Sequence, residues 1–216
     1  TTAFEPLTAA REAGLDIVVI DHHAAQETVP PAVAVINPNR KDEAPGFGHL
    51  CAAGMTFIFC VALARELRGR GFFDGREGRP AAPPDLMRLL DLVAIGTVCD
   101  VVPLTGLNRA FVTRGLPYLS ERTRPGVAAL AELSGVATGA PISAEACGWR
   151  LGPRINAGGR IGDSTLGARC LITDDPQEGR ALAEELDRCN RERKALEEEA
   201  TRQAIEQAAG HQPGVS

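Results

Sequence analysis

The chain has 216 residues, of which 44% are hydrophobic, and its formal net charge is −5 at pH 7. This length is enough for one substantial core plus an appendage, without cross-links to hold it together. The acidic excess lies in residues 174–206, which hold 11 acidic and 6 basic side chains, whereas the remaining residues hold 17 of each sign. Net charge therefore neither supports nor excludes a partner rich in phosphate.

The cysteines and the apolar runs indicate the cellular compartment. The six cysteines form no C-x-x-C pair and lie inside apolar or helical patterns, so we expect reduced core residues of a cytosolic protein. The longest apolar run, residues 51–64, is too short to cross a bilayer, and no secretory signal pattern opens the sequence. We expect a soluble cytoplasmic protein without a membrane partner. Because it starts at Thr1 rather than methionine, we expect it to be part of a longer chain.

Two short β-branched stretches predict strands of a parallel sheet. Residues 17–20 form a continuous apolar run, typical of a strand covered on both faces, and residues 32–36 form a second one that ends at the turn-forming segment 37–39. Apolar residues at helical spacing predict a helix over residues 50–67. The stretch 69–84, rich in Gly, Pro and Arg, predicts a surface loop.

The second half of the chain predicts one more strand and several helices. We expect a buried strand and turn over residues 93–102, and helices over residues 85–92, 107–119, 125–133 and 143–150. Strands alternating with helices predict an α/β fold, with a mostly parallel sheet flanked by helices.

The last segment predicts one long helix. Residues 175–178 (DPQE) resemble a capped helix start, and an apolar stripe then continues to about residue 209 through Leu182, Leu186, Cys189, Leu196 and Ala200. We predict a core domain at residues 1–174, a connecting helix at residues 175–210 and a tail at residues 211–216.

Polar side chains follow the first strand and the later apolar segment. Asp21, His22 and His23 end the sequence GLDIVVIDHH, and Asp100 stands among aliphatic residues in GTVCDVVPL. Sites in open α/β sheets gather beyond the carboxyl ends of strands, and a carboxylate among buried aliphatics needs a partner or a cation. Carboxylate and imidazole ligands suit Mn²⁺ or Mg²⁺, and Zn²⁺ less specifically. The alternative for Asp21, His22 and His23 is that they simply begin a polar loop, and the alternative for Asp100 is that it caps the adjacent turn. We expect the three successive side chains after the strand to point in different directions.

The segment LGPRINAGGRIGD, residues 151–163, combines glycines with two arginines. The glycines permit close backbone approach, Arg154 and Arg160 carry planar forks suited to phosphate oxygens, and Asn156 offers a further donor. We predict a glycine-rich turn that clamps phosphate; the alternative is a surface turn before a helix at residue 164. Trp149 could stack on a base, but we expect it to pack behind this turn.

In this order, IDHH, GTVCDVVPL and LGPRINAGGRIGD resemble the DHH phosphoesterase superfamily and, within it, the RecJ single-strand-specific exonucleases. The resemblance covers residues 17 to about 175. It implies a two-metal phosphodiesterase, dependent on Mn²⁺ or Mg²⁺, that degrades single-stranded DNA from its 5′ end in DNA repair and recombination. It implies that His22 and Asp100 hold one ion, that Asp21 orients the site, and that His23 lies near the scissile phosphate. Arg154 would grip phosphate.

The chain also departs from that family. The aspartate-rich DxD segment and the aspartate of the second motif have no counterpart and would precede Thr1, and the C-terminal domain with its GGH loop is absent. Cys99 and Gly158 stand where alanine is usual. We therefore expect these 216 residues to be inactive or nearly so by themselves.

Other functions and partners remain open at this point. One alternative is a DHH phosphodiesterase that acts on oligoribonucleotides or cyclic dinucleotides, and another is a non-catalytic nucleic-acid-binding scaffold. The expected substrate is single-stranded DNA, a helicase and a single-strand-binding protein are candidate partners, and we expect a monomer.

Overall fold

The computed structural model describes residues 2–43 and 46–210, so the predicted tail at residues 211–216 lies outside the described residues. The chain divides into two compact units, Thr1–Ser120 and Glu121–Ser216, called here the N-terminal and C-terminal units. This division falls between residues 120 and 121. It does not test the domain boundary predicted after residue 174, which stays a prediction. Among the described helices, none combines the length and the apolar character needed to span a membrane.

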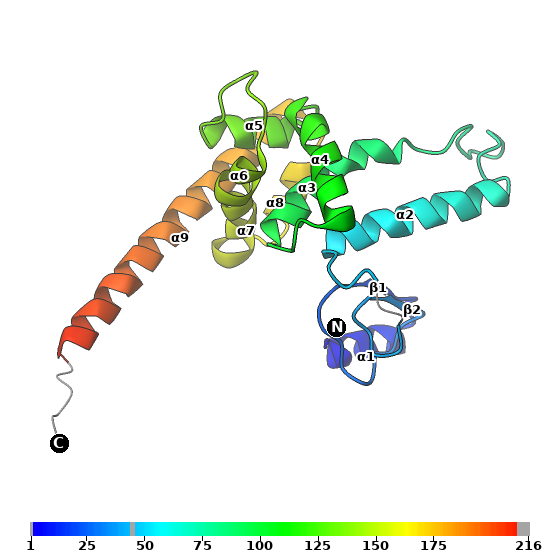
Figure 1. Ribbon diagram of the computed structural model, residues 1–216, viewed down its shortest axis with the longest axis horizontal. Helices are drawn as coiled ribbons and strands as arrows, with labels where there is room; N and C mark the ends of the chain where they lie inside the picture. The colour runs from blue at the N-terminus through cyan, green and yellow to red at the C-terminus, as the bar shows by residue number, and fades with distance from the viewer. Residues whose placement is uncertain (1, 44–45, 211–216) are drawn as a thin grey trace. The chain divides into compact units, whose positions relative to one another are not determined.

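The N-terminal unit combines a small parallel sheet with helices, which confirms the α/β class. Its elements are α1 (Phe4–Glu12), β1 (Val18–Ile20), β2 (Ala34–Ile36), α2 (Ala52–Gly69), the 3₁₀ helix η1 (Leu86–Leu89), α3 (Leu90–Cys99) and α4 (Gly106–Ser120). Strands β1 and β2 pair in parallel, with Val18 opposite Ala34 and Ile20 opposite Ile36. Figure 1 shows α2 running away from these strands toward the loop that precedes η1.

The third predicted strand is wrong, because residues 93–98 lie inside helix α3. This helix is apolar on nearly all sides and packs between α2 and α4. Gly96 allows the close approach to α2, since a Cβ atom there would stand 2.7 Å from the Cβ of Ala53. The prediction failed because periodicity cannot separate a short buried strand from a fully buried helix. The sheet within the described residues has two strands.

The regular elements described in the C-terminal unit are all helices, joined by loops. Its elements are α5 (Pro125–Leu133), α6 (Ala144–Ala146), the π-helix η2 (Cys147–Leu151), α7 (Gly152–Ile161), α8 (Leu166–Ile172) and α9 (Pro176–Gly210). The predicted start of the long helix is confirmed: the Asp175 carboxylate accepts a hydrogen bond from the Gln177 N–H at 2.8 Å. The Glu178 carboxylate reaches back past the helix start and accepts a hydrogen bond from the Thr173 hydroxyl at 2.6 Å.

Helix α9 is buried along its first half only. That half packs on α5, α7 and α8 and buries Leu182, Leu186 and Cys189, whereas Leu196 and Ala200, from the same predicted stripe, are exposed. Figure 1 shows the second half, in orange and red, continuing beyond the other helices of its unit. The apolar stripe therefore predicts the packing correctly as far as residue 190.

The predicted glycine-rich turn is also wrong, because residues 152–161 form helix α7. The buried Gly158 faces α9: a Cβ atom there would stand 2.9 Å from the Leu186 side chain. This glycine therefore serves the approach of two helices rather than that of backbone to a phosphate.

Each unit has its own apolar core. Partly buried side chains pack against both cores, from the strands and helices in the N-terminal unit and from helices in the C-terminal unit. In the N-terminal unit the buried residues are Leu50, Met55, Leu90, Val93 and Phe111. In the C-terminal unit they are Ala129, Leu130, Leu166, Cys170, Leu182, Ala183 and Leu186. All six cysteines are free thiols, as expected of reduced core residues.

Candidate metal centre

The chain leaves β1 in a turn that is organised by the Asp21 carboxylate. Its Oδ1 accepts hydrogen bonds from the backbone N–H of His22 at 2.7 Å and of His23 at 3.2 Å, and it lies 2.7 Å from Nδ1 of the His23 ring. One possible ligand atom from each of the three side chains lies within 4.8 Å of the others. The expectation that these side chains diverge is therefore wrong, because the carboxylate folds back on the amides that follow it.

Asp100 lies beside this turn although it comes from a distant part of the sequence. Its Oδ2 is 3.4 Å from Nε2 of His22, and the two side chains are 37% and 14% exposed. Two ligands about 2.1 Å from one ion, at neighbouring octahedral positions, stand about 3 Å apart. A nitrogen and an oxygen at this spacing fit a single Mn²⁺ or Mg²⁺ and leave further coordination positions open.

The environment of Asp100 differs from the one predicted. This residue caps the C-terminal end of helix α3 and is exposed, rather than standing at a strand end among buried aliphatics. The negative end of a helix dipole favours a cation there. The next residue, Val101, is 87% exposed and has a φ of 56°, a left-handed conformation that is strained for a β-branched side chain. A sharp, strained turn thus immediately follows the candidate ligand.

Cys99, next to the candidate ligand Asp100, is a partly buried thiol. Burial, together with the negative charge of Asp100, raises the pKa of this thiol to about 11. It was not among the predicted ligands, and it stands where the resembling family has alanine.

Two asparagines after β2 hold the turn that carries the histidines. The Asn37 amide donates to the His23 carbonyl at 2.9 Å, and the Asn39 amide donates to the His22 carbonyl at 2.6 Å and to the Gly48 carbonyl at 3.2 Å. The sequence predicted only a turn at residues 37–39. The signal for a larger role was the presence of two carboxamides directly after the strand that neighbours β1.

A third asparagine ties the loop of Asp100 to the same region. Asn108 is fully buried, and its amide donates to the His49 carbonyl at 2.7 Å and to the Pro103 carbonyl at 2.9 Å. Because Gly48 and His49 are consecutive, hydrogen bonds connect the His22 turn with the loop after Asp100. Nothing in the sequence around Asn108 indicated this role.

Replacing Asn39 by alanine should weaken metal binding. In the protein that contains this chain, we expect Asn39→Ala to lower Mn²⁺ affinity about 10- to 100-fold, the usual cost of losing a group that orients a ligand. Calorimetric Mn²⁺ titration measures this without turnover. Asn39→Asp keeps the size but loses the N–H donor, and should behave like alanine. Lys41→Ala, at an exposed position two residues on, is the control. Unchanged Mn²⁺ affinity in both Asn39 variants would contradict the role.

The residues predicted to bind phosphate lie in the C-terminal unit and differ in availability. The Arg154 guanidinium donates to Asp187 at 2.8 Å and to the Arg150 carbonyl at 2.8 Å, so it joins α7 to α9. The side chains of Asn156 and Arg160 are exposed and form no hydrogen bond or ion pair within the part of the chain that the structure describes. Of the two arginines, Arg160 has the freer charge.

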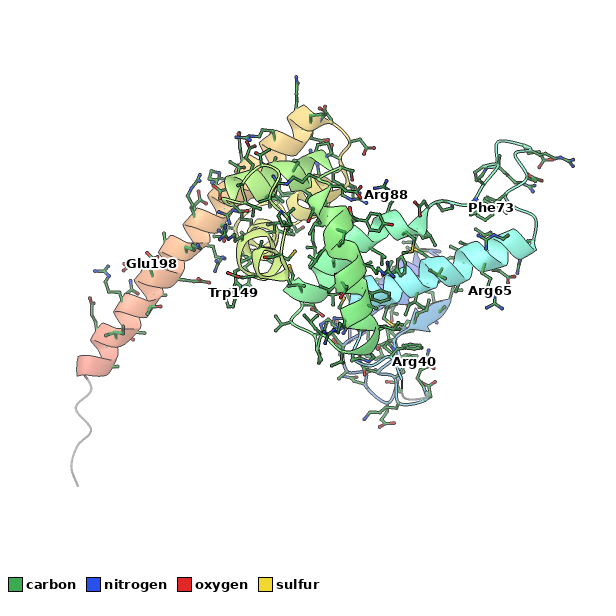
Figure 2. The ribbon with its side chains drawn as sticks, turned by 45° about the horizontal axis from the view of Figure 1, so that its top comes forward. Arg40, Arg65, Phe73, Arg88, Trp149 and Glu198 are labelled. Carbon is green, nitrogen blue, oxygen red and sulfur yellow. The ribbon has the colours of Figure 1, made fainter. Side chains whose placement is uncertain are left out.

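Trp149 does not pack behind the glycine-rich segment, so that expectation is wrong. Its side chain is 81% exposed, and Figure 2 shows it at the outer edge of the yellow helical segment. Trp149 is part of the π-helix η2. The expectation that it packs rested on the small number of aromatic residues in the sequence.

The family and the relatives of the chain can be set beside this geometry. Residues 1–97 match the DHH family, N-terminal domain. The chain is 41% identical over 197 residues to the "Single-stranded-DNA-specific exonuclease RecJ" of Salmonella typhimurium, a match that covers 91% of this chain and 33% of the relative. The protein with the same description from Thermus thermophilus is 36% identical over 200 residues, which is 91% of this chain and 26% of the relative. The chain thus spans about a third or less of the length of these curated relatives.

Solved structures give the same likeness in three dimensions. The "Crystal structure of exonuclease RecJ bound to manganese" matches with a TM-score of 0.76 at 34% identity, over 95% of this chain and 48% of that chain. RecJ from Thermus thermophilus, in complex with Mn²⁺, matches with a TM-score of 0.75 at 35% identity, over 96% of this chain and 29% of that chain. The fold therefore agrees with that of proteins that bind the type of ion the candidate centre fits.

Proposed function

Because this chain belongs to the DHH family and is similar to RecJ proteins over nine-tenths of its length, we propose that it is part of a metal-dependent exonuclease. The substrate we propose is single-stranded DNA, hydrolysed from its 5′ end. The observation that carries the proposal is the pairing of His22 with Asp100, 3.4 Å apart where β1 and α3 end. The resemblance to RecJ exonucleases implies that these two residues hold one ion.

Each residue of the candidate centre would have a separate role. His22 Nε2 and the Asp100 carboxylate would hold one Mn²⁺ or Mg²⁺, and a second ion would need ligands from outside this chain. When bound, such ions lower the pKa of water and stabilise negative charge on phosphate oxygens. Asp21 fixes the His23 ring through Nδ1, which leaves Nε2 of this 74% exposed side chain available to the substrate phosphate or to the attacking water.

The test compares three substrates and two lengths of protein. We expect the full-length protein with Mn²⁺ to degrade 5′-labelled single-stranded DNA, and to leave a short RNA and a cyclic dinucleotide largely intact. A chelator should stop the reaction. Residues 1–216 alone should show little or no activity. Preferential cleavage of the RNA or of the cyclic dinucleotide would point to another DHH phosphodiesterase, and binding without any turnover would point to a scaffold.

The biological setting follows from this activity. We propose a cytoplasmic role in DNA repair and recombination, as a monomer that receives single strands from a helicase and meets a single-strand-binding protein. Light scattering would give the oligomeric state, and pull-down with purified candidate partners would test the contacts.

A further inference from the structure

One exposed face of the C-terminal unit carries side chains that the metal centre does not use. Helix α6, the π-helix η2 and helix α7 follow one another without a break from Ala144 to Ile161. Trp149, Asn156 and Arg160 are exposed along this segment, whereas Leu151, Ala157 and Gly158 are buried on its other side. Asn156 and Arg160, four positions apart, lie on one face of helix α7, and the exposed Trp149 lies in the π-helix that precedes it. We call Trp149, Asn156 and Arg160 the indole face.

The side chains of the indole face have no competing partner. Among the described residues, no hydrogen bond, ion pair or ring contact involves any of these three side chains. Arg154, the arginine expected to grip phosphate, instead has two donors engaged by Asp187 and the Arg150 carbonyl. Within this segment, the guanidinium of Arg160 is unengaged, whereas that of the exposed Arg150 donates to the Gly135 carbonyl at 3.1 Å.

The chemistry of the face matches single-stranded nucleic acid. An exposed indole provides a flat surface for a base of any identity, and a free guanidinium binds phosphate oxygens. From Trp149 to Arg160 the axial distance is about 16 Å, at ~1.5 Å per residue, so the two would contact different nucleotides of one strand. The segment's acidic residue, Glu145, lies before Trp149, at the end opposite Arg160. A strand would thus run from Trp149 toward Arg160.

We propose that Trp149 is a stacking platform for a base of the single-stranded substrate, with Arg160 and Asn156 holding the backbone farther along the same helix. This inference rests on the proposed function and adds a binding contact to it. Trp149 lies in the π-turn at Cys147–Leu151, and such turns are frequent at functional sites.

The test measures DNA affinity of the full-length protein without divalent cations, so that no turnover occurs. We expect Trp149→Ala to weaken binding of an oligodeoxynucleotide about 10-fold, as for loss of one stacked base, and Trp149→Phe to retain most of it. The dependence of affinity on salt should be unchanged in Trp149→Ala, but its slope should fall by about one in Arg160→Ala. Ile172→Ala, at a position 64% exposed in the same unit, is the matched control.

An abasic nucleotide distinguishes stacking on a base from contacts to the sugar and phosphate. Scanned along the strand, it should weaken wild-type binding at one position and have no further effect there on Trp149→Ala. Equal DNA affinity of the wild type and Trp149→Ala would overturn the proposed platform. A loss of affinity in Trp149→Ala that no abasic position reproduces would also overturn it, because Trp149 would then act through contacts to protein. If the wild type neither binds nor degrades single-stranded DNA, the proposed function itself fails.

Discussion

Replacing Asp100 by alanine is expected to abolish turnover of single-stranded DNA in the full-length protein. The loss of turnover should exceed the roughly 100-fold typical of residues that only orient a ligand. The reason is that Asp100 supplies one of the two proposed metal-ligand atoms, the other being on His22. DNA affinity should change little, since the contacts to the strand are made elsewhere. Single-turnover hydrolysis and DNA binding, measured separately, would give both quantities.

A second carboxylate makes the control for Asp100 sharp. Asp16 is exposed in the same unit and has no ion pair within the described residues, so Asp16→Ala removes an equal charge away from the centre. It should leave turnover intact. Mn²⁺ titration should show weaker binding in Asp100→Ala and none of that change in Asp16→Ala. If Asp100→Ala retained full turnover, the chain would be a scaffold or its ligands would lie elsewhere.

The candidate metal centre could be located from sequence because it depends on residue types and their order. The DHH triplet and Asp100 could be identified in that way, and the structure brings His22 and Asp100 together as the prediction required. The reason given for their meeting was wrong, however. Asp100 reaches the centre from the end of a helix, because an apolar run of this length fits a buried helix as well as a strand.

Features that depend on three-dimensional packing could not be predicted. The side-chain amides of Asn39 and Asn108 donate to backbone carbonyls, which carry no residue-type signal. Trp149 is exposed and lies in a π-turn, for which no sequence rule was available. Gly158 was taken for part of a phosphate loop, whereas its close approach is to Leu186 of another helix.

Gly126 shows how strongly such packing constrains the fold, and Gly126→Ala should destabilise the C-terminal unit severely. A Cβ atom at this buried position of α5 would stand 1.9 Å from the Cys170 carbonyl oxygen and 2.8 Å from its sulfur. Because the nearest atom is backbone, no rotation of a side chain relieves the clash. We expect a loss of about 3 kcal/mol or more in the free energy of unfolding, at the upper end for overpacked cores.

Gly159→Ala provides the matched control, because a Cβ atom in that part of α7 would meet nothing within 4 Å. Alanine there should stabilise the unit by about 0.5–1 kcal/mol, the usual gain over glycine inside a helix. Hydrogen exchange of the α5 and α8 amides in the full-length protein reports on this unit alone and gives both values. Similar protection of these amides in the two variants would mean that α5 and α8 do not touch at Gly126.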